Sequence, residues 1–190
     1  MSQKGPHKQL LLTSLSKYYA QNQASRTMLK NILTGNSISL RVIDWFVTHY
    51  APSQNIVYWI DDKNNFIEKH PTDGGDKLKK FHLYLEYRSQ LKSYTKLHFD
   101  PFRRHERITF ILDTQPELVT IETTVGQLNF FRWCFQNHVI TYILKHILEI
   151  EKAMTASITD NKIINIDNDV RKTPSIHHVQ CHLKLSLIHI

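Results

Sequence analysis

The chain has few of the residues that form cross-links, tight turns or membrane spans. Its 190 residues include 2 Cys, 5 Gly and 6 Pro. Two thiols, Cys134 and Cys181, are too few for a disulfide framework or a four-thiolate zinc site, and they favour a reducing, intracellular environment. The low Gly and Pro content argues against a long flexible linker. Apolar stretches such as 10–12 and 108–112 are much shorter than the roughly 20 residues that cross a bilayer, so no membrane partner is expected.

The N-terminus also lacks the features of a secretory signal. It begins with a weakly basic stretch, but Thr13, Ser14 and Ser16 interrupt the apolar run that follows. The composition is otherwise that of a globular protein, with 41% hydrophobic and 11% aromatic residues. The chain is long enough for one domain with its own hydrophobic core.

Catalytic motifs are absent from the sequence. There is no phosphate-binding Walker loop, no paired-glycine dinucleotide fingerprint and no GxSxG elbow. The acidic clusters at 61–62 and 73–76 lie in turn-like sequence, where solvated side chains are usual. His177, His178 and His182 gather with Cys181 near the C-terminus, but we interpret them as tail residues rather than metal ligands. We therefore predict no catalytic residue, no metal and no cofactor, and Cys134 is interpreted as a buried, inert thiol.

Positive charge is concentrated in one segment. Residues 77–107 contain nine basic and three acidic side chains, an excess of six, whereas the formal net charge of the whole chain is +7. Such an asymmetry suggests a polyanionic partner. The alternative is a solvated face whose arginines pair with Asp100, with Glu106 or with carboxylates in the rest of the chain. The predicted nucleic-acid-binding residues are Lys77, Lys80, Arg88, Lys92, Lys96, Arg103, Arg104 and Arg107.

The chemistry of this segment suits phosphates and bases. Arginines hold phosphate oxygens in two-point contacts that lysine cannot make. Tyr94, Phe99 and Phe102 lie close in sequence and are candidates for stacking on unpaired bases.

Hydrophobic spacing predicts helices at 9–19, 25–35, 39–50, 77–96, 124–136 and 139–154. Ser25 is a candidate cap for the second helix, and Thr124 with Gln127 fits a capping box. Residues rich in β-branched and aromatic types predict strands at 55–60, 66–68, 107–112 and 117–122. The fold class is therefore α+β, a mainly helical single domain with a small antiparallel sheet of two hairpins. In the 77–96 helix, Arg88, Lys92 and Lys96 would form one basic ridge.

The hydrophobic pattern fades after residue 156. We predict one domain over 1–156 and an irregular or disordered tail over 157–184. The last six residues, 185–190, can be encoded by CTGTCTCTTATACACATC, the start of a transposase end sequence used in sequencing libraries. We expect these residues to be adapter-encoded, so the natural chain would be truncated and its source would be assembled environmental sequence.

Three segments together resemble a known group of proteins. They are SLRVIDWFVTHY (39–50), YLEYRSQLKSYTKLHFDPFRRHERI (84–108) and TTVGQLNFFRWCFQNHVITYI (123–143). This pattern is similar to a conserved, uncharacterised protein of the nucleocytoplasmic large DNA viruses, the giant viruses related to mimivirus and the algal viruses. The resemblance implies a viral protein that works in the host cytoplasm, in a virus factory, or in the virion. It implies no activity that could be assigned to particular residues.

These observations leave three hypotheses about function. The first is a viral nucleic-acid-binding or gene-expression accessory protein that contacts DNA or RNA through the basic helix and the RRHER segment. The second is a virion or assembly protein that binds an acidic viral protein through the same face. The third is an enzyme whose chemistry lies in a missing C-terminal part. The sequence does not determine the oligomeric state.

Overall fold

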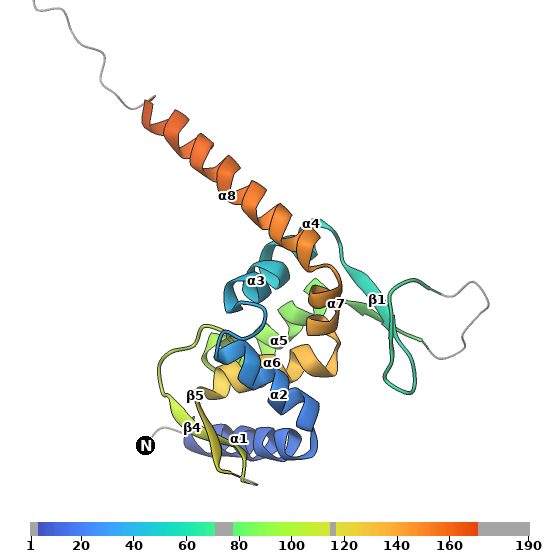
Figure 1. The fold of residues 1–190 in the computed structure, drawn as a ribbon, viewed down its shortest axis with the longest axis vertical. Helices are drawn as coiled ribbons and strands as arrows, with labels where there is room; N and C mark the ends of the chain where they lie inside the picture. Colours follow the sequence, from blue (N-terminus) through green and yellow to red (C-terminus); the bar gives the residue numbers. More distant parts are fainter. Residues whose placement is uncertain (1–3, 71–77, 115–116, 171–190) are drawn as a thin grey trace, which may run out of the picture. The chain divides into compact units, whose positions relative to one another are not determined.

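The computed structural model describes residues 4–70, 78–114 and 117–170, and Figure 1 shows their helices and strands. The chain divides into two compact units between Met154 and Thr155. The predicted tail cluster around Cys181, the adapter-like residues and Lys77 lie outside the described residues. Within the described ranges, no helix combines the length and hydrophobicity that a bilayer crossing requires.

Two helices, α1 (Lys4–Gln21) and α2 (Gln23–Leu33), open the fold. Leu11, Leu15 and Tyr19 recur at every fourth position and are buried, so α1 presents one apolar face to the core. The hydroxyl of Tyr19 donates to the carbonyl of Leu128 at 2.9 Å. Both predicted helices are confirmed, but Ser25 is not the cap. Asn22 occupies that position, and Oγ of Ser25 lies 2.9 Å from the hydroxyl of Tyr18.

The helix predicted over 39–50 is present as three consecutive helical segments, of which the middle one is π-helical. They are α3 (Leu40–Trp45), the π-helical η1 (Phe46–Tyr50) and α4 (Ala51–Ser53). The side chain of Ser39 caps α3 by accepting from the backbone N–H of Val42 at 3.2 Å. Pro52 lies inside α4 rather than beyond it, because the first turn of a helix does not need its missing N–H.

A three-stranded antiparallel sheet, called sheet A here, follows. It contains β1 (Val57–Ile60), β2 (Phe66–Ile67) and β3 (Lys79–His82), in the order β2-β1-β3. The predicted hairpin of β1 and β2 is confirmed. The prediction of helix from residue 77 is wrong for 79–82, which pair with β1 instead. This pairing satisfies the backbone of β3 and buries Phe81 against Tyr58, with ring centroids 5.0 Å apart.

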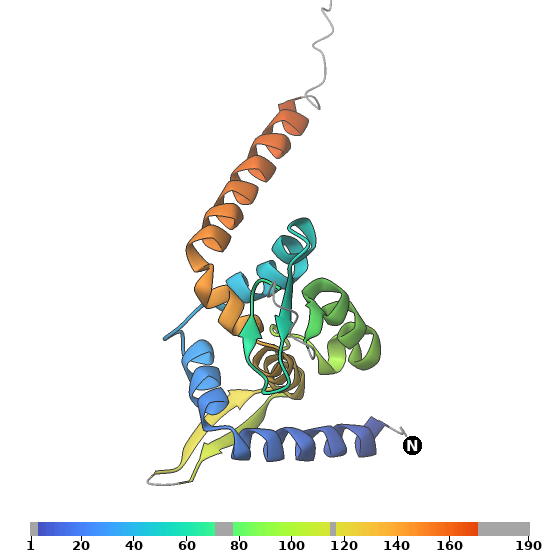
Figure 2. The same cartoon turned by 90° about the vertical axis from the view of Figure 1, so that its right-hand side faces the viewer.

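Helix α5 (Leu83–His98) continues directly from β3 and is interrupted near its end. Thr95 has φ 57° and ψ 169°, so the last residues do not continue the helical path. A second hairpin, β4 (Ile108–Asp113) with β5 (Val119–Thr123), confirms the two predicted strands. It lies beside α1 in both views (Figures 1 and 2).

Helix α6 (Val125–Gln136) is the central helix of the core and packs against α1, α2 and α5. Eight of its residues are buried: Val125, Gly126, Leu128, Asn129, Phe130, Phe131, Trp133 and Cys134. The Cys134 thiol is buried as predicted, and this burial raises its pKa.

The predicted capping box at the start of α6 is half formed. Thr124 accepts from the N–H of Gln127 at 3.1 Å. The amide of Gln127 donates to the carbonyl of Pro101 at 2.7 Å instead of reaching back to Thr124. The side chain that would have closed the box therefore holds a neighbouring loop.

The last predicted helix is divided into α7 (Val139–Lys145) and α8 (Ile147–Val170). His138 separates α6 from α7 in the left-handed conformation, with φ 58° and ψ 21°, at the break that the sequence predicts. The irregular tail predicted from residue 157 is helical as far as Val170, and 171–190 lie outside the described residues.

Candidate nucleic-acid interface

The predicted binding residues occur on three different elements rather than on one helix. Lys80 belongs to β3, Arg88 and Lys92 to α5, and three arginines to the loop between α5 and β4. All the described members are exposed except Arg103, which is half-buried.

Only two of the three cations of the predicted ridge remain together. Arg88 and Lys92 lie one turn apart on α5 and line one surface depression, together with the exposed Leu85. Nη1 of Arg88 lies 3.3 Å from the hydroxyl of Tyr84, and its guanidinium lies 5.9 Å from the centre of that ring. Lys96 follows the interruption at Thr95, so the prediction that it continues the ridge is wrong.

The arginine loop is anchored at its base by backbone and side-chain contacts. Asp100 Oδ1 accepts from the N–H of Phe102 at 2.7 Å, and the N–H of Asp100 donates to the carbonyl of Gly126 at 3.3 Å. The side-chain stem of Arg103 lies close to Gly126, where an added Cβ would be 3.4 Å from it. Because the base of the loop is fixed to α6, the exposed Arg104 and Arg107 extend from a defined support.

The cations of this segment form no close ion pair with a carboxylate in the described part of the chain, although Arg103 lies near enough to help lower the pKa of Glu106. None of its eight described cations forms an ion pair there. Glu106 pairs with Lys8 at 2.6 Å, and this contact is the main cause that lowers its pKa. Asp100 is occupied by the backbone of its own turn. The predicted alternative, in which the arginines pair with these two acids or with carboxylates in the rest of the chain, is therefore not observed among the described residues.

The three candidate stacking residues have different environments. Phe99 is 1% exposed, and its ring packs against Phe130 and Trp133 at 5.3 and 5.6 Å. It belongs to the core, so its prediction as an accessible stacking residue is wrong. Tyr94 is half-buried and stacks on Phe99 at 6.3 Å. Phe102 is 38% exposed and remains accessible at the tip of its turn.

An aromatic residue that the sequence analysis did not select lies on sheet A. Trp59 is directly opposite Lys80 of β3 and Ile67 of β2, and it is only partly buried. Its neighbours in sequence, Tyr58 and Ile60, are buried. No sequence signal indicated that Trp59 faces outward, because residues 57–60 are all apolar or aromatic, and residue 80 had been predicted to lie in a helix. Because of that helix prediction, Lys80 was not expected to lie opposite Trp59.

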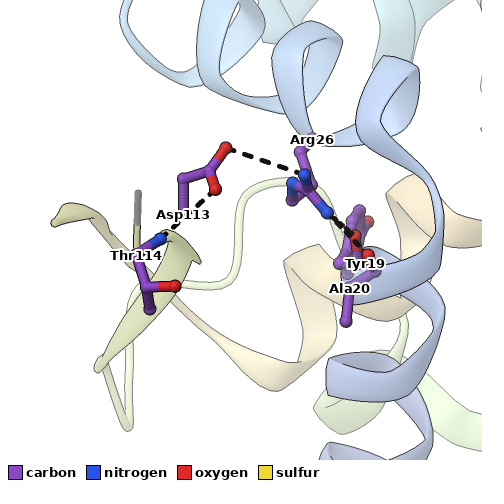
Figure 3. A network of polar contacts seen from close by, with 5 residues as sticks. All are labelled: Tyr19, Ala20, Arg26, Asp113 and Thr114. Atoms are coloured by element: carbon purple, nitrogen blue, oxygen red, sulfur yellow. Dashed lines mark hydrogen bonds and ion pairs between the residues drawn. The ribbon is translucent and has the colours of Figure 1, made fainter. Parts of the chain in front are cut away.

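A second polar cluster, centred on Arg26, holds α1 to the β4–β5 hairpin (Figure 3). Nη1 of Arg26 donates to the carbonyls of Tyr19 and Ala20, both at 2.8 Å, and Nη2 lies 3.6 Å from Asp113. Two depressions of about 300 and 320 Å³ flank this side chain. Since its contacts cap the end of α1, the cluster has a structural explanation. In the described ranges, no group of three or more His, Cys, Asp or Glu residues is arranged to hold a metal ion.

Fold and surface together define a mainly helical α+β protein with an unpaired basic surface, and sequence comparison places it in a family. The chain belongs to a family of unknown function, DUF7197, whose model matches residues 3–180. It is 36% identical over 138 residues to the uncharacterized protein L507 of Acanthamoeba polyphaga mimivirus. That match covers 72% of this chain and 49% of the relative, so the chain spans about half of the relative's length. No solved structure matches the chain. The resemblance to an uncharacterised giant-virus protein is therefore confirmed.

Proposed function

We propose that this protein binds nucleic acid and serves as an accessory factor in viral gene expression. The observation that carries the proposal is the surplus of positive charge at 77–107, whose described members have no carboxylate partner in the described part of the chain. Exposed, unpaired arginines and lysines bind phosphates and release the counterions that surround them. Such a protein would act in the host cytoplasm, where a virus factory forms, or would be packaged in the virion.

The test is a binding measurement across salt concentrations. Labelled DNA and RNA oligonucleotides are titrated with the full chain, and the logarithm of affinity should fall linearly with that of salt. The expected slope is about 0.9 per phosphate neutralised on duplex DNA. Reversing four cations to Glu, at Arg88, Lys92, Arg103 and Arg104, should abolish most of this dependence.

A matched control distinguishes the effect of the local basic surface on affinity from the effect of the net charge. The control reverses four exposed cations outside the segment, Lys17, Lys30, Arg41 and Lys152. Both variants change the net charge equally, so general electrostatic attraction predicts equal losses of affinity. The proposal predicts a large loss only in the first variant. Equal losses, or no salt-dependent binding by the unmodified chain, would overturn it.

An acidic protein partner is the alternative outcome of the same design. In that case the chain would co-purify with capsid or other viral proteins after nuclease treatment, and the first charge reversal would prevent this. The exposed Leu85, 65% accessible beside Arg88 and Lys92 on α5, would suit such a partner as an apolar contact.

A further inference from the structure

The outer face of sheet A carries an aromatic residue beside unpaired positive charge. The antiparallel register places Ile67, Trp59 and Lys80 in one row across the three strands. Val57 and His82 form the next row on the same face. Directly opposite side chains on paired strands share a face with their Cβ atoms about 5 Å apart. An indole ring and an ammonium group are therefore neighbours on this surface.

Core packing does not account for Trp59. The inner face of the sheet is filled by Tyr58, Ile60 and Phe81, which are 0–6% exposed. Trp59 points to the other side, where its ring meets that of His70 edge-to-face, with centroids 5.4 Å apart. A partly exposed tryptophan on the outer face of a small sheet adds little to the core, but it offers a flat, rigid surface to a partner.

The charges around Trp59 are arranged unequally. Lys80 is exposed and has no ion pair within the described ranges. Lys79 belongs to the other face of the sheet, where its ammonium lies 5.8 Å from the centre of the Phe81 ring. Asp61, which follows Ile60 at the hairpin end of β1, accepts hydrogen bonds from the backbone and side chain of Asn65, at 2.6 and 2.8 Å. A phosphate would be attracted to the β3 side and repelled from the hairpin turn. The surface thus fits a ligand with a flat ring and a phosphate on one side of it.

We propose that this face of sheet A binds single-stranded nucleic acid, with Trp59 stacking on an unpaired base and Lys80 contacting an adjacent phosphate. The inference rests on the proposed function and makes it more specific, because only an unpaired base exposes its face to a side chain. Stacking of this kind tolerates any base, so little sequence preference is expected.

The principal test compares two substitutions of the same residue. Trp59→Leu keeps an apolar side chain but removes the aromatic ring, whereas Trp59→Phe keeps a smaller ring. The probes are single-stranded oligothymidine and oligouridine of about 12 nucleotides, within the site sizes of known single-strand binders, and a DNA duplex of equal length. Trp59→Leu should weaken binding to both single strands by at least about fivefold, the lower end of what one stacked base contributes. Duplex affinity should not change.

Tryptophan emission provides a readout that a merely structural role would not affect. The oligonucleotide should quench the emission of the unmodified chain, since a stacked base contacts the indole directly. Trp59→Phe should abolish this quenching while retaining most of the affinity. Trp45→Leu is the matched control, because Trp45 is also partly buried but stacks on His49 of η1. This control should leave single-strand affinity unchanged.

The possible failures can be distinguished from one another. If Trp59→Leu leaves single-strand affinity intact while the four-cation reversal lowers it, this inference is wrong and the proposed function stands. If the unmodified chain binds neither single strands nor duplex, both are wrong. Quenching by polyglutamate as strong as that by oligothymidine would assign the face to an acidic protein and overturn the inference. Circular dichroism and thermal melting would establish that each variant is folded.

Discussion

Glu68 is the residue that connects the β1–β2 hairpin to the junction of α7 and α8. Its side chain is 27% exposed and contacts Nζ of Lys145. Nε2 of His146 lies 2.8 Å from its other oxygen, a close contact that is poorly aligned for a hydrogen bond. Lys145 is the main cause that lowers the pKa of Glu68. The carboxylate is therefore more stable in the folded protein than in the unfolded chain.

Removing the charge of Glu68 should lower the stability of the folded protein by an amount that depends on pH. Because the folded pKa is below the unfolded value of about 4.3, the contribution is fully present above that value and is lost as pH falls through the folded pKa. Glu68→Gln should lower the free energy of unfolding by roughly 0.5–1 kcal/mol at neutral pH, as expected for a partly exposed pair. The difference from the unmodified protein should shrink as pH falls below the unfolded value and disappear only below the lowered folded pKa of Glu68. Urea unfolding across pH measures both quantities.

An exposed carboxylate without such partners among the described residues provides the control. Glu117 is exposed and precedes β5. Glu117→Gln should change stability by less than about 0.5 kcal/mol at every pH. A Glu68 variant that behaved in the same way would show that its contacts with Lys145 and His146 contribute nothing measurable.

At the scale of elements, the ends of α5 show where sequence patterns were insufficient. Phe81, Tyr84 and Tyr87 are spaced as on one helical face, so the sequence favoured a helix beginning near 77. Phe81 is buried for a different reason, because it lies on β3 opposite Tyr58. Helix and strand spacing cannot be distinguished over so few residues, and the choice depends on a pairing partner about 20 positions earlier. By contrast, the β4–β5 hairpin was predictable because its two strands are adjacent in sequence.

Thr95 interrupts α5 in a backbone conformation that suits glycine. Its φ of 57° with ψ 169° forces the branched side chain towards its own backbone, a strain of about 1–3 kcal/mol. Its Oγ accepts from the N–H of Leu97 at 3.3 Å, which offsets little of that strain. Thr95→Gly should therefore raise the free energy of unfolding by up to about 1 kcal/mol, after the entropic cost of a glycine is subtracted.

A glycine placed two residues earlier should have the opposite effect. Ser93 lies in the regular part of α5, where its hydroxyl donates to the carbonyl of Ser89 at 3.0 Å. Ser93→Gly should lower the free energy of unfolding by about 0.5 kcal/mol through lost helix propensity. Thermal melting of the two variants compares the signs directly. If Thr95→Gly is as destabilising as Ser93→Gly, then residue 95 is not strained.

At the scale of the whole molecule, the sequence predicted which segment is basic but not which of its residues share an exposed surface. Charge counting identified residues 77–107 without any knowledge of the fold. It could not show that Lys80 lies on a sheet, that Thr95 separates Lys96 from the ridge, or that Phe99 is in the core. These facts depend on contacts between distant parts of the chain. Trp59 was not predicted as a binding residue for the same reason, since its position beside Lys80 depends on the pairing of β1 with β3.

The first compact unit should fold without the rest of the chain. Every described residue of the buried core lies before Thr155, and the last of them is Ile150, which is fully buried. Met154 packs against that core and is half-buried. A chain ending at residue 156 therefore keeps all the described core and all the cations of the basic segment. Its melting temperature and oligonucleotide affinity should match those of the full chain.

A more severe truncation tests whether the first compact unit ends where its core packing ends. A chain ending at residue 146 loses Ile147, Ile150 and Met154, and removal of one buried aliphatic side chain alone costs about 2–5 kcal/mol. Since small domains are stable by only about 5–15 kcal/mol, this chain should melt far lower or not fold. If the chain ending at 156 were equally unstable, residues 157–170 of α8 would be needed for the fold.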